Sequence, residues 1–442
     1  MKNQIKIRNR IKPFSKKIFV ASDKSLSIRA ILLSSIAIGK SNIYNLLESE
    51  DVYNALKVIK KLGVKFKKKK KFIEIYGVGI NGFKLGSKII LDSGNSGTLA
   101  RCVLGLCSSI NKEIKLVGDK SLSKRDFSRV IEPLKLFGVK IKSKNGMLPV
   151  VSLGSNFLRP INYFEKKGSA QIKTCIILSA INTPGVTKIK SVRSRNHTEL
   201  MLKNLNYPIN IIKTKKYDLI QVTGLHNFNA FNYNIPGDIS SASFFIVLTL
   251  LSKNSDLLIQ NVNVNPSRVG IIAILNRMNA KIKIINKRKY KGELIGDIKI
   301  RSAKKLKSIN CPENLNSSAI DEFILIFLVA CKASGISSFK NLSELNKKES
   351  PRLDIAIKFM QMIGVKVVRK KDNIKVFGNP RLKLKGNYRV KNFIKDHRIF
   401  MMSTVAALTL GGTSWTIDDK DSIKTSFPTF LNILNKLGAK IN

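Results

Sequence analysis

Acidic residues are scarce in this chain. Its 442 residues include 28 Asp and Glu against 80 Lys and Arg, so the formal net charge is +52. Long apolar runs are lacking too, because the best candidate, residues 323–330, has the length of a core element and is too short to span a bilayer. The basic N-terminus has no apolar block of the kind found in secretory signals. We therefore expect a globular cytoplasmic protein that does not contact a membrane.

Residues that bind metals are few and dispersed. The five cysteines lie in apolar stretches without metal-site spacing, at positions 102, 107, 175, 311 and 331. This pattern predicts free thiols in a reducing compartment. The three histidines, His197, His226 and His397, are scattered along the sequence, so we expect no metal site.

The excess of lysine has two interpretations. A nucleic-acid-binding protein needs dense Lys and Arg to neutralise phosphates. Here the basic residues are spread along the whole chain, and aromatic residues, on which bases could stack, make up only 7%. Lys, Ile and Asn are all frequent and have codons rich in A and T, so drift in base composition accounts for the charge better. A basic nucleic-acid-binding or scaffolding protein without catalysis stays as an alternative, and a weak electrostatic affinity for nucleic acid is expected in either case.

A short sequence motif recurs six times along the chain. Six helix-like apolar stretches end in a Gly or Asn, and β-branched runs typically follow. Gly and Asn best tolerate the left-handed backbone found just beyond a helix C-terminus. The six residues are Gly63, Gly138, Asn206, Asn279, Gly364 and Gly438. Their spacing of 68 to 85 residues predicts six αβ modules, and the length of the chain favours two domains.

Basic and small polar residues gather at the starts of predicted helices in the first half. The segments are residues 22–29, 92–101, 118–125 and 168–173. Unpaired backbone N–H groups and the helix dipole attract anions to a helix N-terminus. One such segment is an ordinary helix cap, whereas four of them predict an anion-binding site.

Carboxylates join basic residues in the second half. Asp321 and Glu322 precede an apolar helix, and one of them is a candidate N-cap. Residues 347–352 and 396–398 are expected to open two further helices, and residues 424–428 to open the last one. Because bases outnumber acids in these segments, the substrate should be polyanionic, and the carboxylates could serve as acid and base.

Together these segments resemble the enolpyruvyl transferases, and most closely those that act on shikimate 3-phosphate. The resemblance extends from about Ile5 to the C-terminus, in the right order. The matching pieces are Asp23-Lys24-Ser25-x-Ser27-x-Arg29, Gly94-Asn95-Ser96-Gly97-Thr98-x-x-Arg101, Gly168-Ser169-Ala170-Gln171-x-Lys173, Pro236-Gly237-Asp238-x-Ser240-Ser241-Ala242, Ile320-Asp321-Glu322, Lys348-Glu349-Ser350-x-Arg352, Asp396-His397-Arg398 and Lys424-Thr425-x-Phe427-Pro428.

The resemblance implies an α/β fold of two similar domains, each of three βαβαββ-type repeats, with helix N-termini facing an interdomain cleft. One domain would be discontinuous, residues 1–21 plus 238–442, and residues 22–237 would form the inserted domain. The family acts without a metal or organic cofactor, so none is expected, and we expect a monomer whose partners are small-molecule substrates.

The resemblance also implies a reaction and its residues. The enolpyruvyl group of phosphoenolpyruvate would pass to the 5-hydroxyl of shikimate 3-phosphate, with Asp321 as base, Glu349 as acid and Lys24 sharing in proton transfer. The residues matching shikimate 3-phosphate ligands are Lys24, Ser25, Arg29, Ser169, Ala170, Gln171, Ser194, Asp321 and Lys348. Those matching phosphoenolpyruvate ligands are Lys24, Asn95, Gly97, Arg125, Gln171, Arg352, Arg398 and Lys424.

The nearest rival is the sister family that acts on UDP-N-acetylglucosamine. That family uses a Cys in the loop corresponding to residues 119–129, and this chain has none there. Five positions depart from the shikimate pattern. Ala21-Ser22 stands in place of Pro-Gly, Ile28 in place of a polar residue, Cys102 in place of Pro, and Pro351 in place of Asp. Gly97, which has no side chain, is expected to leave room for the inhibitor glyphosate.

Overall fold

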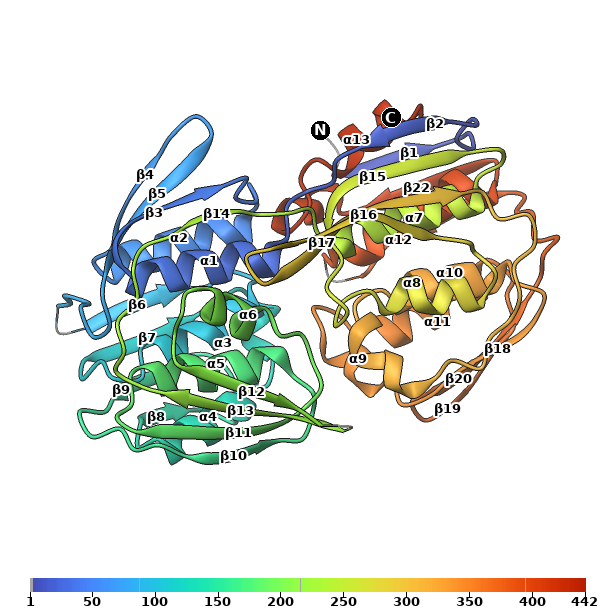
Figure 1. Cartoon of the computed structure of the whole chain (residues 1–442). Coiled ribbons are helices and arrows are strands. Elements are labelled where there is room, and N and C mark those ends of the chain that lie inside the picture. Colours follow the sequence, from blue (N-terminus) through green and yellow to red (C-terminus); the bar gives the residue numbers. More distant parts are fainter. Residues whose placement is uncertain (1–2, 87, 215, 394) are drawn as a thin grey trace. The chain divides into compact units, whose positions relative to one another are not determined.

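The chain folds into two compact units. The computed structural model describes residues 3–86, 88–214, 216–393 and 395–442 (Figure 1). Unit 1 comprises Met1–Ala21, Pro236–Arg288 and Leu294–Asn442, and unit 2 comprises Ser22–Ile235 and Lys289–Glu293. The boundary near residue 236 lies two residues before the one expected from the sequence. The short segment Lys289–Glu293, which the sequence did not single out, groups with unit 2.

Unit 2 contains small mixed sheets rather than one large sheet. In each of its three described sheets, a parallel pair of strands at one edge is followed by antiparallel pairs. The strand orders are β14 (Asn232–Asn234), β3 (Ile38–Tyr44), β5 (Phe72–Val78), β4 (Lys65–Lys68); β6 (Lys88–Asp92), β7 (Glu113–Val117), β9 (Val150–Gly154), β8 (Lys140–Ser143); and β10 (Asn162–Glu165), β11 (Val186–Val192), β13 (Tyr217–Thr223), β12 (Ile209–Lys213).

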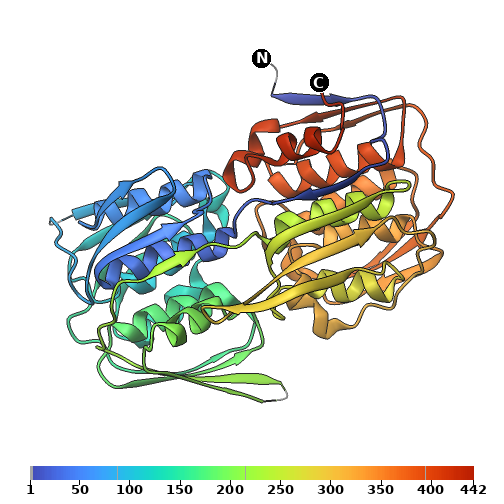
Figure 2. The same ribbon diagram turned by 45° about the horizontal axis from the view of Figure 1, so that its top comes forward.

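Unit 1 also has three small sheets among its described residues. Their strand orders are β16 (Lys283–Tyr290), β17 (Glu293–Arg301), β15 (Asp256–Asn263), β2 (Ser15–Ile18); β18 (Gly335–Phe339), β20 (Asn373–Gly378), β19 (Val367–Lys370); and β1 (Gln4–Ile7), β22 (Ser414–Asp418), β21 (Asn387–Val390). Strand β1 of the last sheet contacts the C-terminal residue, because the N–H of Lys6 donates to the carbonyl of Asn442 at 2.7 Å (Figure 2).

Apolar helices pack together at the centre of each unit. In unit 2 they are α1 (Lys24–Ile36), α3 (Gly97–Leu106) and α5 (Ala170–Ile181), and in unit 1 they are α7 (Ile239–Leu251), α10 (Phe323–Cys331) and α12 (His397–Leu410). These helices are apolar around most of their circumference, as expected of helices enclosed on all sides. All nine residues of α10, for example, are buried. The mixed α/β class predicted from the sequence is therefore confirmed.

A second set of helices ends at the repeated Gly or Asn residues. These are α2 (Glu50–Lys61), α4 (Ser128–Leu136), α6 (His197–Asn204), α8 (Gly270–Arg277), α11 (Arg352–Met362) and α13 (Phe430–Lys436). The predicted left-handed conformation is confirmed at all six positions, with φ between 54° and 96°. Strands β4, β8, β12, β16 and β19 follow the first five, as expected. The remaining elements are the short helix α9 (Asn316–Ala319) and the 3₁₀ helices η1 (Leu122–Lys124), η2 (Glu313–Leu315), η3 (Ser343–Lys347) and η4 (Lys420–Thr425).

Helix α1 begins at Lys24, inside the segment 22–29 that was expected at its start. The carboxylate of Asp23 sets this boundary, because it accepts a hydrogen bond from the N–H of Leu26 at 2.9 Å and caps the helix.

The described residues contain no single helix that is long and apolar enough to cross a bilayer. One helix pair, Glu313–Ala319 and Phe323–Cys331, reaches the necessary length and hydropathy only when its two members are combined across a bend of 117°.

Candidate active site

Lys24 is the first residue of α1 in unit 2. A cation is unfavourable at this end of a helix because the dipole is positive there. A carboxylate offsets this cost, since the Lys24 Nζ lies 2.9 Å from Oδ2 of Asp51 in the first turn of α2. Asp51 is not among the residues that the sequence motifs predicted for the site. Its position in a helix's first turn, next to Glu50, gave no sign of a functional role.

Arg29 and Ser25, both expected to bind shikimate 3-phosphate, lie one helical turn apart and in contact. Nη1 of Arg29 donates to the carbonyl of Ser25 at 3.1 Å. Its other donors reach the hydroxyls of Thr174 on α5 (3.0 Å) and Thr198 on α6 (2.8 Å). Arg29 is only 4% exposed. It therefore links the first turn of α1 to two helices that carry other predicted site residues.

Ser169 and Ala170 stand at the start of α5. The Ser169 hydroxyl caps the helix by accepting from the N–H of Ile172 at 3.4 Å, which leaves its own hydrogen available to donate. The N–H of Ser169 donates to Glu165 at 3.0 Å. Burial raises the pKa of Glu165, against backbone N–H groups that favour its charged form. Ser194 is buried, and its hydroxyl has no hydrogen-bond partner among the described residues.

The loop that carries Ser194 leads into α6, which a buried hydrogen bond and a buried ion pair hold in place. Nδ1 of His197 lies 2.7 Å from Oε1 of Glu293, and both side chains are fully buried. Nζ of Lys173 on α5 lies 2.7 Å from Oε1 of Glu199 on α6, and these side chains are buried too. His197 therefore packs inside unit 2, where its side chain contacts Glu293, the first residue of β17.

The start of α3 brings together four of the residues expected to bind phosphoenolpyruvate. Arg125 donates to the Asn95 side-chain oxygen at 3.3 Å. Arg101 donates to the Gln171 side-chain oxygen at 2.7 Å. A methyl group built on Gly97 would lie 2.9 Å from a guanidinium nitrogen of each arginine. Gly97 is thus the point where these two guanidinium groups meet.

Arg101 has a larger part in this group than the sequence suggested. It belongs to the matching motif, but the resemblance gave it no role. Its guanidinium donates to the Asp126 carbonyl at 3.0 Å and lies over the ring of Phe127, 4.9 Å from the centroid. Burial, followed by the nearby charges of Arg125 and Arg129, lowers the pKa of Arg101 to about 10, so it stays charged at neutral pH.

In unit 1, Arg352 lies in the middle of a group of carboxylates. It is 1% exposed, and its Nε and Nη2 donate to Asp396 at 2.8 and 3.2 Å. Further contacts reach Glu349 at 2.5 Å and Asp321 at 3.5 Å. Burial opposes the charge of Arg352, but the carboxylates of Asp396, Glu349 and Asp321 outweigh it and raise the pKa. Arg352 is thus held by the carboxylates proposed for proton transfer.

Three basic side chains lie close to the Asp321 carboxylate. Its Oδ1 lies 3.2 Å from Nζ of Lys348 as well as 3.5 Å from Arg352. Its Oδ2 lies 3.9 Å from Arg398, which also donates to the Asp321 carbonyl at 3.0 Å. The predicted residues Asp321, Lys348, Glu349, Arg352 and Arg398 are therefore brought together by the fold, although they come from three separate segments.

The start of α11 explains how Pro351 is accommodated. Pro351 occupies the N-cap position and has no side chain that could accept a hydrogen bond. The side-chain oxygen of Asn346 instead accepts from the N–H groups of Leu353 and Asp354 at 2.9 and 3.3 Å. A cap supplied from η3 therefore replaces the Asp that the family pattern has here.

The predicted position of Lys424 at the start of the last helix is wrong. Residues 424–428 do not open the last helix, because Lys424 lies in η4 and α13 starts at Phe430. The Lys424 side chain is 57% exposed and pairs with Asp421 at 2.8 Å. Its neighbour Thr425 reaches Nδ1 of His397 at 3.3 Å, next to Arg398 in sequence.

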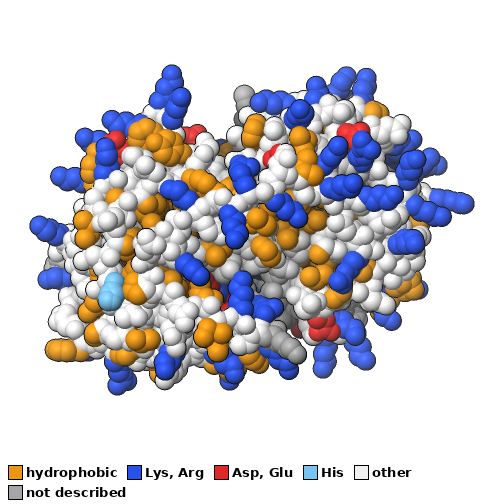
Figure 3. Space-filling model, viewed as in Figure 1, with side chains coloured by type: hydrophobic (Ala, Val, Ile, Leu, Met, Phe, Trp, Pro, Cys, Tyr) orange, Lys and Arg blue, Asp and Glu red, His pale blue; other side chains and the backbone are white. Residues whose placement is uncertain are grey.

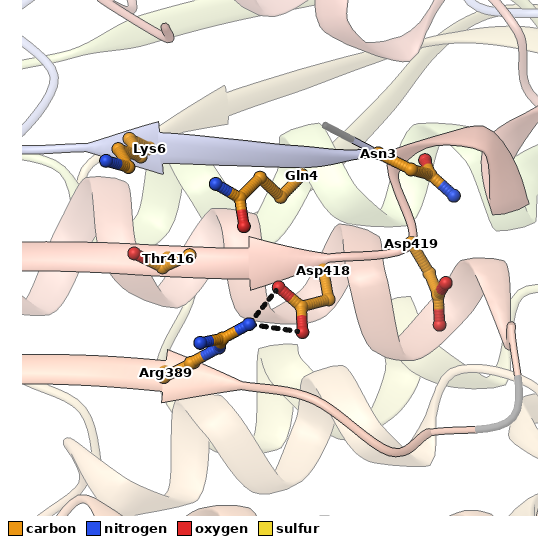
Figure 4. A pocket seen from close by; sticks show the side chains of 7 residues that line it. All are labelled: Asn3, Gln4, Lys6, Arg389, Thr416, Asp418 and Asp419. Atoms are coloured by element: carbon orange, nitrogen blue, oxygen red, sulfur yellow. Dashed lines mark hydrogen bonds and ion pairs between the residues drawn. The ribbon is translucent and has the colours of Figure 1, made fainter. Parts of the chain in front are cut away.

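A surface pocket of unit 1 lies apart from all these residues. It has a volume of about 580 Å³ and is lined by the outer strands β1, β21 and β22 (Figure 4). Arg389 donates to both carboxylate oxygens of Asp418 across its floor, at 3.4 and 3.2 Å. No predicted site residue lines this pocket.

The remaining basic residues form no single stripe on the face that Figure 3 shows. Lys and Arg side chains are scattered there over both units, with apolar and neutral polar surface between them. Within the described parts of the chain, no three His, Cys, Asp or Glu side chains are grouped as a metal ion would require.

Basic side chains and carboxylates at the starts of buried helices define a class of protein that binds small anionic molecules. The chain belongs to the EPSP synthase (3-phosphoshikimate 1-carboxyvinyltransferase) family, whose model matches residues 8–434. The resemblance drawn from the sequence motifs is therefore confirmed.

Relatives and solved structures agree. A 3-phosphoshikimate 1-carboxyvinyltransferase of Ruthia magnifica is 39% identical over 428 residues, 96% of this chain and 95% of the relative. One from Zymomonas mobilis is 36% identical over 433 residues, 97% of this chain and 95% of the relative. An EPSP synthase structure from Acinetobacter baumannii aligns with a TM-score of 0.86 and 33% identity, covering 99% of both chains. The enolpyruvyl transferase NikO from Streptomyces tendae shares the fold, with a TM-score of 0.76 at 14% identity and coverage of 100% and 98%.

Proposed function

We propose that this protein transfers the enolpyruvyl group of phosphoenolpyruvate to the 5-hydroxyl of shikimate 3-phosphate and releases phosphate. This is the activity for which its full-length relatives are named. One observation carries the proposal. Lys348, Arg352 and Arg398 surround the Asp321 carboxylate, and Arg352 also contacts the Glu349 carboxylate.

The charges fit the substrates. Each substrate carries a phosphate and a carboxylate, so cationic donors must offset their mutual repulsion. Planar guanidinium groups bind such anions through two parallel hydrogen bonds. We propose that Arg125, Arg352 and Arg398 bind phosphoenolpyruvate, with Lys24, Asn95, Gly97, Gln171 and Lys424. Arg29, Ser25, Ser169, Ala170, Gln171, Ser194, Asp321, Lys348 and Lys24 are proposed to bind shikimate 3-phosphate.

The proposed reaction requires three proton transfers. Asp321 takes the proton of the 5-hydroxyl as the oxygen bonds to the central carbon of phosphoenolpyruvate, and Glu349 gives a proton to the methylene carbon. The resulting tetrahedral intermediate expels phosphate as the Glu349 carboxylate takes back a proton from the methyl group, which restores the vinyl group. Basic side chains stabilise the leaving phosphate, and Lys24 shares in proton transfer. The proposed mechanism uses side chains of the protein alone.

The finer organisation is part of the same proposal. We take residues 1–21 plus 238–442 and residues 22–237 as two domains of three repeats each, and the protein as a cytoplasmic monomer. Five free and buried cysteines fit a reducing compartment.

The test is release of inorganic phosphate from phosphoenolpyruvate by the purified protein. Phosphate should appear only when shikimate 3-phosphate is present, and UDP-N-acetylglucosamine should not replace it. The Asp321→Asn variant is the control for contaminating activity. Turnover with UDP-N-acetylglucosamine, or none with either acceptor, would contradict the proposal.

A further inference from the structure

Glu322 is a buried carboxylate in unit 1 with no role assigned so far. It stands at the N-cap position of α10, yet its side chain makes no capping hydrogen bond. Its side chain is 1% exposed. A carboxylate is costly to bury unless charge and hydrogen bonds compensate it, so its partners show what holds it there.

The first partner of Glu322 is Arg398. Nη1 of Arg398 lies 3.4 Å from Oε1 of Glu322 and donates to the Asp321 carbonyl at 3.0 Å. Both contacts use the same nitrogen, so one edge of the guanidinium is fixed by residues 321 and 322. The Arg398 side chain is 12% exposed, which leaves part of it accessible to a ligand.

The second partner of Glu322 is Ser240, in the first turn of α7. Its hydroxyl donates to Oε1 of Glu322 at 2.5 Å. The same hydroxyl oxygen accepts from Nη2 of Arg268 at 3.0 Å, and this nitrogen is also 3.0 Å from Oδ1 of Asp238. Arg268 is 2% exposed. The donors thus point in one direction, from Arg268 through Ser240 to Glu322.

This chain of hydrogen bonds joins two motifs that the sequence analysis left unconnected. Asp238 and Ser240 belong to the segment where the chain re-enters unit 1, and the Asp238 N–H donates to the Ala21 carbonyl at 2.9 Å. Glu322 and Arg398 belong to the candidate active site. All of these contacts lie within unit 1.

We propose that Glu322 is a positioning residue that orients Arg398 for phosphoenolpyruvate, with Ser240 and Arg268 holding Glu322 in turn. The proposal rests on the proposed function, because it assumes that Arg398 binds this substrate. Orientation by a second layer of hydrogen bonds keeps a binding group within a fraction of an ångström of its working geometry. Without the Glu322 carboxylate, Arg398 keeps its charge and its contact with the Asp321 carbonyl, but it loses the contact with Oε1 that helps to fix its direction.

The prediction concerns one substrate only. Glu322→Gln keeps the length of the side chain and removes its charge, so it should raise the KM for phosphoenolpyruvate about tenfold, as expected for loss of a charge-assisted hydrogen bond. The KM for shikimate 3-phosphate should stay within about twofold, and kcat should fall less than the KM rises. Ser240→Ala should give a smaller change of the same kind.

Ser243→Ala is the matched control. Ser243 lies on the same helix as Ser240 and is buried, but its hydroxyl bonds to the Ile239 carbonyl at 2.7 Å. It should leave both KM values unchanged. If all three variants lowered only the melting temperature or kcat, or raised both KM values alike, Glu322 would have a structural role and the proposal would be wrong.

A double-mutant cycle tests whether Glu322 acts through Arg398. Arg398→Lys alone should raise the KM for phosphoenolpyruvate, and adding Glu322→Gln should raise it by no more than about twofold further. Multiplied effects would overturn the proposal. If the unmutated protein released no phosphate, the proposed function would be wrong, but the role of Glu322 could still be tested. Calorimetric titration with phosphoenolpyruvate should then give a Kd about tenfold higher for Glu322→Gln than for the unmutated protein.

Discussion

Replacing Arg352 tests whether its charge stabilises unit 1 by compensating the carboxylates of Asp321, Glu349 and Asp396. The Arg352→Met variant keeps the length and apolar stem of the side chain and removes a buried guanidinium that contacts three carboxylates. Breaking a buried ion pair by removing one partner costs about 3–5 kcal/mol, because the other charge stays buried. Arg389→Met is the control: its pair with Asp418 is 59% exposed on the arginine side, so it should cost about 0–1 kcal/mol.

The pH dependence distinguishes this cause from loss of packing. Burial alone would raise the pKa of Asp396, but the charge and hydrogen bond of the Arg352 guanidinium, together with His397, outweigh burial and hold the pKa below its ordinary value. Stability from this pair is therefore present above the pKa of the unfolded carboxyl, about 3.9, and is lost only as the pH falls through the lower folded value. Between about pH 5 and 8 the pair's contribution in the unmutated protein should be constant.

In the Arg352→Met variant the shift of the Asp396 pKa changes direction. Without the guanidinium, burial raises the pKa of Asp396, so folding takes up a proton and the variant gains stability as the pH falls. The difference in unfolding free energy should be largest near pH 8 and shrink toward pH 5, by up to about 1.4 kcal/mol per pH unit. A gap that stays constant over this range would refute the reasoning.

Trp415 provides the assay. It is the only tryptophan in the sequence and is 1% exposed. Its ring stacks on Tyr388, with centroids 4.6 Å apart, and on Phe359 of α11, at 6.1 Å. Its fluorescence in urea titrations thus follows unfolding of unit 1 and of the helix that carries Arg352. If Arg352→Met does not fold, Arg352→Lys, which keeps the charge, should show a smaller loss without the pH trend.

Three further predictions follow from the described contacts. Asp321→Asn and Glu349→Gln should each lower kcat by about 100-fold or more, far more than they lower substrate affinity, because both residues take part in proton transfer. Steady-state kinetics that show affinity loss alone would contradict this. Glyphosate should compete with phosphoenolpyruvate, and Gly97→Ala should weaken both ligands about tenfold, since the added methyl group lies 2.9 Å from the Arg125 guanidinium; unchanged inhibition constants would count against this placement. Burial raises the pKa of Cys311 to about 11, so at pH 8 a thiol reagent should modify it far more slowly in the folded protein than in urea, and equal rates would be the contrary result.

The positions of the helix ends could be predicted from the sequence because their cause is local. A left-handed residue after a helix favours Gly or Asn wherever the helix lies, so residues such as Gly63 and Asn279 indicate the ends of their helices without any knowledge of the tertiary contacts. The mixed α/β class followed from the same pattern. The motif resemblance also identified the family, since ordered short motifs preserve the residues that bind one substrate pair.

Other features could not be predicted because they depend on partners distant in sequence. Asn346 caps α11 in place of Pro351, which no local rule indicates. Glu322 was a candidate cap, yet its carboxylate turns to Ser240, which is 82 residues away. Lys424 was expected at a helix start and lies in a 3₁₀ turn, because residues 420–425 satisfy their hydrogen bonds before α13 begins.

The sequence by itself determined the types of residue at the site and the chemistry they can perform. A run such as Lys348-Glu349-Ser350 carries its charges in any conformation. Only the tertiary structure decided which charges compensate one another: Arg352 is buried among Asp321, Glu349 and Asp396, whereas Lys424 is exposed beside Asp421. The physical reason is that the energy of a charge depends on its burial and on the distance to its counter-charge, and folding sets both.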